Sequence, residues 1–186
     1  AGNKWQVRIS PEEAGEWSYE ASFWEGDRIA VSNSPDSDGT RTSFDGAAGT
    51  FSVDATDKTK PDLRARGTVA NRGDHYLTDE NGEVFIQSGP NIPENFLGYE
   101  HFSNMPEASK EYNSHESDWR SGDPKINDHK GIIGAINFIA ERGANSIYFL
   151  PMNLGGDGKD TYPFPAPDQK TRYDLQKLRE WETVFS

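Results

Sequence analysis

The sequence predicts a mixed β and α/β fold, in which a β-sandwich is followed by the opening of a parallel α/β unit. Three observations predict it. Apolar and polar residues alternate from residue 4 to about 70, a long loop follows residues 84–89, and two segments with helical periodicity come later, at 130–143 and 173–186. Because the period changes partway along the chain, we expect two domains, at 1–70 and 71–186.

The first region is predicted to be antiparallel. Residues 5–9 alternate between apolar and polar, and residues 17–23 do the same. The segment 10–16 between them contains Pro and Gly, so the two strands are expected to form a hairpin. Further short strands are expected at 28–32 and 49–54, and short strands at regular spacing are typical of a β-sandwich.

The second region begins with a hairpin signal. Residues 75–89 carry two apolar arms around Asn81-Gly82, a dipeptide favoured by type I′ turns. The second arm leads into a loop that runs to about residue 129. Loops of such length are uncommon in compact domains and are usually functional.

Helical periodicity follows this loop. Ile132, Ile136 and Ile139 share one face of the first predicted helix, and Gly143 is suited to end it. The almost wholly apolar segment 145–152 is typical of a parallel strand covered on both faces.

The second predicted helix has Asp174 as its N-cap. Its apolar residues share one side. They are Leu175, Leu178, Trp181 and Phe185.

The order of these elements is strand, loop, helix, strand, loop, helix. Such a βαβα run is the unit of an α/β sheet or barrel, with 84–89 and 145–152 as adjacent parallel strands. In these folds the loops after the carboxyl ends of the strands form the ligand-binding face. We therefore expect the loops 90–129 and 153–173 to build one wall of a site.

Several residues of these loops suit a carbohydrate ligand. Aromatic rings stack on sugar faces, and amide or carboxylate groups hydrogen-bond hydroxyls. The alternative for each aromatic residue is that it only packs its loop, and for the asparagines that they brace loop backbone. The candidates for substrate binding are Asn91, Glu94, Asn95, Trp119, Asn153, Asp157 and Asp160, with Tyr99, His101, Tyr112 and His115 as further loop aromatics.

The composition and net charge exclude some classes of binding partner. The 186 residues include 5 Trp, 7 Tyr and 10 Phe, which indicates a folded protein, and the net charge is −12 without a dense basic run. We therefore expect neither nucleic acid nor a membrane as a partner. The chain has no cysteine, so it has no disulfide framework and no thiolate metal site.

No cofactor or metal is predicted. The acidic runs 34–39 and 155–160 lack the full spacing of a calcium loop, and turn chemistry explains them. The four histidines, at positions 75, 101, 115 and 129, show no metal-binding spacing.

The segment 3–23 resembles the end of an immunoglobulin-like domain that precedes the barrel in a family of secreted bacterial glycosidases. The segments 82–102, 117–124, 130–164 and 172–186 resemble the opening of that family's apiosidase-like (β/α)8 barrel. The resemblance implies a partial immunoglobulin-like β-sandwich followed by the first two βα units of an incomplete (β/α)8 barrel. It also implies a secreted or periplasmic protein that degrades polysaccharides.

The resemblance places the catalytic carboxylates of this retaining clan at the ends of the fourth and seventh strands, outside this chain. A whole barrel needs about 250 residues, so we expect this chain to be a piece of one. Its expected partner is the remainder of the barrel, which can be a separate chain. The expected function is that of a fragment of a glycoside hydrolase for a plant or algal polysaccharide or its oligosaccharides, with no catalytic residue of its own. The alternative is a non-catalytic carbohydrate-binding or scaffold module.

Overall fold

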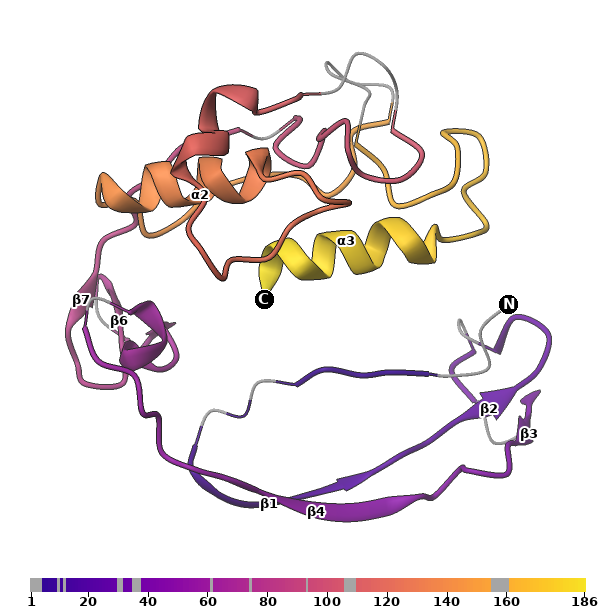
Figure 1. The fold of residues 1–186 in the computed structure, drawn as a ribbon. Helices are drawn as coiled ribbons and strands as arrows, with labels where there is room; N and C mark the ends of the chain where they lie inside the picture. The colour runs from indigo at the N-terminus through magenta and orange to yellow at the C-terminus, as the bar shows by residue number, and fades with distance from the viewer. Residues whose placement is uncertain are drawn as a thin grey trace. The chain divides into compact units, whose positions relative to one another are not determined.

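The computed structural model describes residues 5–9, 11, 13–29, 32–34, 38–60, 62–73, 75–92, 94–105, 110–154 and 161–186. The chain divides into two compact units, Ala1–Phe85 and Ile86–Ser186 (Figure 1). This division groups residues 71–85 with the first unit, whereas the sequence predicted a domain boundary near residue 70.

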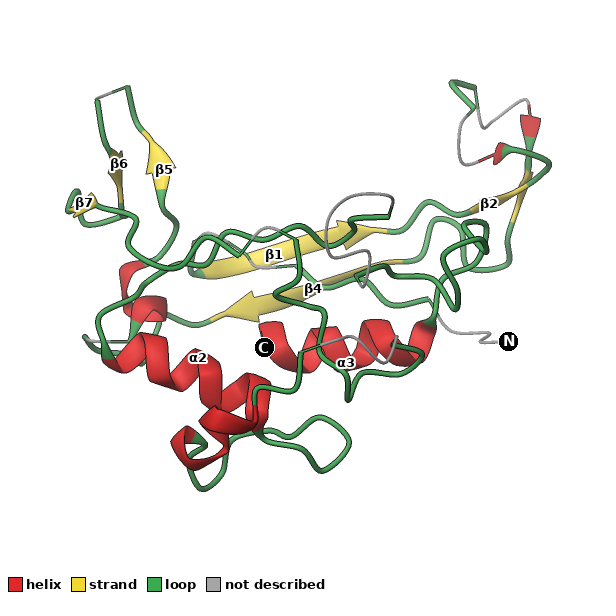
Figure 2. Cartoon of the chain, turned by 90° about the horizontal axis from the view of Figure 1, so that it is seen from above, coloured by secondary structure: helices red, strands yellow, loops and turns green. Residues whose placement is uncertain are grey.

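A two-stranded antiparallel ribbon is the longest sheet of the first unit. In it β1 (Gly15–Glu20) pairs with β4 (Ala48–Val53) (Figure 2). The register places Trp17 opposite Phe51 and Tyr19 opposite Gly49. A Cβ atom at Gly49 would come within 2.7 Å of the Tyr19 hydroxyl oxygen. The Tyr19 ring therefore covers the glycine, an arrangement that stabilises glycine-containing strands.

The predicted hairpin between residues 5–9 and 17–23 is wrong, because β1 pairs with β4 instead. Residues 5–9 form no strand, and Trp5 and Val7 are 74% and 85% exposed. The connection between residue 9 and β1 is longer than a two-residue hairpin turn, so it does not impose a register on its flanking segments. Part of the predicted strand 28–32 lies outside the described residues, and Arg28 is in a turn with φ 56°.

The other sheets of this unit are short and antiparallel. One pairs β2 (Trp24–Glu25) with β3 (Thr40–Arg41). A 3-10 helix, η2 (Leu63–Arg66), precedes the other sheet. That sheet has the order β5-β6-β7, and its strands are β5 (Ala70–Asn71), β6 (Leu77–Thr78) and β7 (Val84–Phe85).

The hairpin predicted around Asn81-Gly82 is confirmed as β6 and β7, with a different turn. Asp79 accepts a hydrogen bond from the Gly82 amide and donates its own amide to the Glu83 carbonyl (3.0 and 2.9 Å). Only Gly82 has a positive φ, 77°, whereas a type I′ turn requires positive φ at both central residues. This is the three-residue hairpin loop with a left-handed glycine, and the Asp79 carboxylate also accepts the Asn81 and Glu83 amides.

Within the described part of the first unit, Asp79 is the only buried residue. A β-sandwich packs two sheets over a shared apolar core, and no such core is present among these residues. The described residues thus show a mixed fold of small sheets and helices, and they form no closed barrel.

The second unit contains the helices α2 (Gly131–Glu141) and α3 (Leu175–Phe185) and the 3-10 helix η3 (Asn113–Asp118). Both predicted helices are confirmed. Gly143, with φ 86°, ends α2 as predicted: its amide donates to the Ala140 carbonyl and the Ala144 amide to the Ile139 carbonyl. This pair of hydrogen bonds is the Schellman motif.

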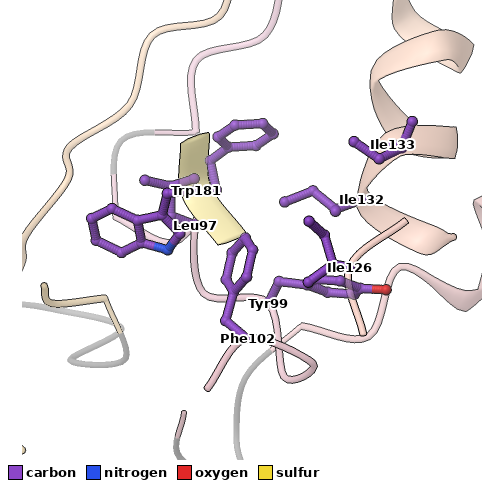
Figure 3. Close-up of a cluster of buried hydrophobic side chains, with 8 residues drawn as sticks. Leu97, Tyr99, Phe102, Ile126, Ile132, Ile133 and Trp181 are labelled. Atoms are coloured by element: carbon purple, nitrogen blue, oxygen red, sulfur yellow. The ribbon is translucent and has the colours of Figure 1, made fainter. Parts of the chain in front are cut away.

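The hydrophobic core of the second unit joins both helices to the long loop (Figure 3). Ile132 is fully buried as predicted, and Ile136 packs against the core while remaining partly exposed. The buried members of the core cluster are Phe96, Leu97, Tyr99, Phe102, Ile126, Ile132, Ile133 and Trp181.

The predicted apolar side of α3 is only partly correct. Trp181 is buried and Leu178 packs against the core, but Leu175 and Phe185 are 55% and 56% exposed. Charged residues occupy the buried face in their place. They are Asp174, Lys177 and Glu180, which follow one another at intervals of three along the helix.

Candidate functional site

Two segments of the second unit run parallel, as the sequence predicted for its apolar strands. Asn91 and Tyr148 form a parallel bridge, in which the Tyr148 amide donates to the Pro90 carbonyl (3.2 Å) and the Ile92 amide to the Tyr148 carbonyl (3.0 Å). The pairing is shorter than expected and begins later in the chain, because residues 84–85 belong to the antiparallel hairpin of the first unit. The order of segment, α2 and parallel segment is that of a βαβ unit.

Asn145 and Gly89 bring the two segments close together. The Asn145 amide donates to the Ser88 carbonyl (2.7 Å), and its side chain accepts from the Ser88 amide (2.8 Å) and donates to the Ile86 carbonyl (2.9 Å). A Cβ atom at Gly89 would lie 1.7 Å from the Ser146 carbonyl oxygen. The glycine is therefore required by the close approach of the two backbones.

The loops that follow these segments meet at Asn153. Its side-chain amide donates to the Glu94 carbonyl, and its backbone amide donates to the Thr161 carbonyl (3.1 Å). Asn153 is 9% exposed and Thr161 is fully buried. The Thr161 hydroxyl has no hydrogen-bond partner among the described residues. Polar groups from both loops are thus gathered beyond the parallel bridge.

The predicted site residues differ in accessibility. The side chains of Asn91 and Glu94 are exposed, and Asn95 is partly buried, with its carbonyl accepting the Gly98 amide (3.0 Å). The structure therefore brings Glu94 and Asn153 together and leaves the Glu94 carboxylate open to solvent. Asp157 and Asp160 lie outside the described residues.

Trp119 is held by its own surroundings. Its indole N–H donates to the Pro124 carbonyl (3.0 Å), and the ammonium groups of Lys130 and Lys125 lie 4.6 and 5.2 Å from the centre of its ring. Such cation–π contacts occupy the ring surface that a sugar would stack on. These contacts tie Trp119 to the segment 124–130, whereas Glu94 and Asn153 are joined by a hydrogen bond of their own.

Tyr99, Tyr112 and His101 pack the loop, which was the alternative for each of them, and the His115 ring packs on Phe138 of α2, with centroids 4.6 Å apart. Tyr99 is fully buried in the core, and burial raises the pKa of its hydroxyl to about 12 despite the nearby amides of Gly131 and Ile132. The Tyr112 hydroxyl donates to the Phe96 carbonyl (3.0 Å). The rings of His101 and His129 stack, with centroids 3.3 Å apart and planes 9° apart.

The stacked histidines stand at a strained turn. Ile126 and His129 form an antiparallel bridge, and the two residues between them, Asn127 and Asp128, both have positive φ, 48° and 69°. Positive φ at both central residues defines a type I′ turn. Asn127 is fixed by donating to the His101 carbonyl (2.8 Å). Burial and the neighbouring His129 ring lower the pKa of His101.

The sequence did not predict the buried charged network on α3. The Glu180 carboxylate accepts from the Ser103 amide and hydroxyl (both 2.7 Å), from the Asn127 side chain (3.0 Å) and from Gln176 (3.1 Å). The Asp174 carboxylate accepts from the Asn104 side chain (2.6 Å). The spacing of Asp174, Lys177 and Glu180 was the available signal, since residues three apart share a helix face.

Burial affects the pKa values of two charged groups at the start of α3, Lys177 and Asp174. Burial lowers the pKa of the fully buried Lys177, while Asp174 and Glu180 act in the opposite direction. Burial alone would raise the pKa of Asp174. The hydrogen bonds from Asn104 and the helix amides and the charge of Lys177 outweigh burial, so the pKa is lowered.

Within the described ranges, no three His, Asp or Glu side chains stand close enough to hold a metal ion. None of the helices in that part of the chain has both the length and the apolar character needed to cross a bilayer.

Comparison of the chain with family models, with curated proteins and with solved structures gave no match.

Proposed function

We propose that this chain supplies part of the carbohydrate-binding rim of a secreted or periplasmic glycoside hydrolase that acts on a plant or algal polysaccharide or its oligosaccharides. One observation carries the proposal: the Asn153 side chain joins the Glu94 carbonyl just beyond the carboxyl ends of two parallel segments. Ligands of α/β folds bind at this position. The exposed Glu94 carboxylate and the side chains of Asn91 and Asn95 are suited to sugar hydroxyls, while the buried Asn153 positions the loop that carries Glu94.

Within the proposal, a retaining mechanism uses two carboxylates about 5–5.5 Å apart, and the resemblance of the sequence places both outside these residues. This chain therefore binds and orients sugar without cleaving it. Its proposed partner is the remainder of an immunoglobulin-like and (β/α)8 glycosidase, in which further parallel strands continue the sheet.

The exposure pattern of residues 147–152 supports this partner. Ile147 and Phe149 pack against the core, whereas Tyr148, Leu150 and Met152 are 52%, 37% and 48% exposed. The sequence predicted a strand covered on both faces, and that prediction is wrong for the described chain, where one side is partly exposed. In a barrel, alternate residues of each strand face the filled interior, and the exposed side chains here suit that place.

Binding of oligosaccharides tests the proposal. Calorimetric titration of the 186-residue chain with a panel of neutral plant and algal oligosaccharides should identify a ligand. Glu94→Gln should then weaken binding by tenfold or more, since a hydrogen bond to a charged group contributes about 1.5–3 kcal/mol. The variant keeps the backbone carbonyl of residue 94, which accepts the hydrogen bond from the Asn153 side chain.

Glu116→Gln is the matched control, because Glu116 is also an exposed carboxylate of the second unit. It should bind as the wild type does. Failure of every oligosaccharide to bind, or equal binding by Glu94→Gln and the wild type, would contradict the proposal.

A non-catalytic carbohydrate-binding module is the second candidate. It is favoured by the aromatic face of the β1–β4 ribbon, where Trp17 and Tyr19 are 36% and 52% exposed. If this face is the binding surface, Trp17→Ala abolishes oligosaccharide binding and Glu94→Gln leaves it unchanged.

A further inference from the structure

We infer that Lys177 is a positioning residue: its ammonium group ties the two loops of the candidate site to α3 and thereby fixes the place of Asn153. The inference rests on the proposed function in one respect, because the rim that Lys177 positions is the proposed sugar site. The geometry behind it is independent of any ligand.

Lys177 is fully buried, and its ammonium group contacts both loops. It donates to the Asn104 carbonyl (3.2 Å) in the first loop. In the second loop it donates to the carbonyls of Tyr162 (3.3 Å) and Phe164 (3.2 Å), and it lies 4.2 Å from the centre of the Tyr162 ring. The three hydrogens of an ammonium group are thus matched to three carbonyl oxygens.

A continuous path leads from this ammonium group to the site. Tyr162 directly follows Thr161, whose carbonyl accepts the Asn153 amide (3.1 Å). The Asn153 side chain in turn donates to the Glu94 carbonyl. Displacement of Tyr162 would therefore be transmitted to Asn153 through one peptide unit and one hydrogen bond.

The same face of α3 also binds the first loop, at Ser103 and Asn104. Asn104 has φ 53°, a left-handed conformation that is uncommon outside glycine and is held in place by its surroundings. Asp174 accepts from its side chain (2.6 Å), Lys177 donates to its carbonyl, and Glu180 holds the adjacent Ser103. Three charged residues of one helix face thus fix both loops, and the two carboxylates raise the pKa of Lys177 against the effect of burial.

Hydrogen exchange followed by NMR, on the 186-residue chain without sugar, tests the inference. In Lys177→Met, protection of the Asn153 amide should fall about tenfold relative to the α2 amides, the size expected for losing a hydrogen bond to a charged group. Leu178→Ala is the matched control, since Leu178 is the next residue of α3 and its apolar side chain packs on the core. It should lower protection of the Asn153 and α2 amides in the same proportion.

Two results would overturn the inference. One is unchanged Asn153 protection in Lys177→Met, and the other is an equal loss at Asn153 and throughout α2, which would indicate general destabilisation. If Lys177→Met does not fold, a pH titration of the wild-type chain followed by NMR tests the inference instead. The chemical shift of the Lys177 Cε atom reports its deprotonation as pH rises, and the amide shift of Asn153 should change over the same pH range. An Asn153 amide shift that does not change over that range refutes the inference.

The outcome is separate from that of the proposed function. Coupling between Lys177 and Asn153 without sugar binding would refute the glycosidase rim alone. Sugar binding without the coupling would refute the role of Lys177 alone.

Discussion

Gly134→Ala should loosen the contact between α2 and η3. In most helices this substitution is favourable, because alanine exceeds glycine in helix propensity by about 1 kcal/mol. At Gly134, however, a Cβ atom would lie 1.9 Å from the carbonyl oxygen of His115 and 2.9 Å from its carbon. Both atoms belong to the backbone, so no rotation of a side chain relieves the overlap.

The magnitude follows from this competition. Overpacking a tight contact costs about 1–3 kcal/mol, and a clash with a backbone carbonyl belongs at the upper end of that range. Subtracting the gain of about 1 kcal/mol in helix propensity leaves a net destabilisation of about 2 kcal/mol. The displaced η3 would also carry Trp119 away from the core cluster against which it packs.

Urea unfolding followed by tryptophan fluorescence measures this effect, since Trp119 and Trp181 both lie at the core of the second unit. Ala140→Gly, at an exposed position of the same helix, isolates the propensity term and should cost about 1 kcal/mol. An unchanged or increased free energy of unfolding in Gly134→Ala would contradict the close contact between Gly134 of α2 and the His115 carbonyl of η3.

Three further predictions concern pH and chain pairing. Because the pKa of His101 is lowered from 6.5 by burial and by His129, the folded chain binds fewer protons than the unfolded chain in mild acid. The free energy of unfolding should therefore fall as pH drops from 6.5 through the lowered pKa, and urea midpoints of His101→Phe should lack this dependence. The pKa of Asp174 is lowered from 3.8 although burial opposes this, so its contribution is present above pH 3.8 and is lost as pH falls through the lowered value. Asp174→Ala should cost about 1–2 kcal/mol at neutral pH through loss of the N-cap, and an unchanged urea midpoint would contradict the cap. Since the chain has no cysteine, the variant with Asn91→Cys and Tyr148→Cys should form an intramolecular disulfide on mild oxidation, and mass spectrometry showing only free thiols would contradict the parallel bridge.

The helices were the most predictable part of this fold. Isoleucines on one face predicted α2, Gly143 predicted its end, and Asp174 predicted the start of α3, because each of these signals acts within a few residues of sequence. The rule that parallel segments bring their ends to one edge led to the expectation that the loops 90–129 and 153–173 meet. The particular hydrogen bond between Asn153 and the Glu94 backbone carbonyl was not predicted.

Long-range pairing could not be predicted in the same way. Residues 5–9 alternate as a strand does, yet β1 pairs with β4, because the partner of a strand depends on distant residues such as Phe51 and Gly49. The buried face of α3 was missed because charged residues are seldom buried unless they are paired, and the partners of Lys177 are carbonyl groups that no side-chain pattern reveals.

The most direct test of the account is to map carbohydrate binding on the chain by NMR. Titration of the labelled 186-residue chain with the tightest-binding oligosaccharide should shift the amide signals of Glu94 and Asn95 and the side-chain NH2 signals of Asn153. Shifts confined to the first unit, around Trp17 and Tyr19, would contradict the central claim that the loops after the parallel segments form the sugar site.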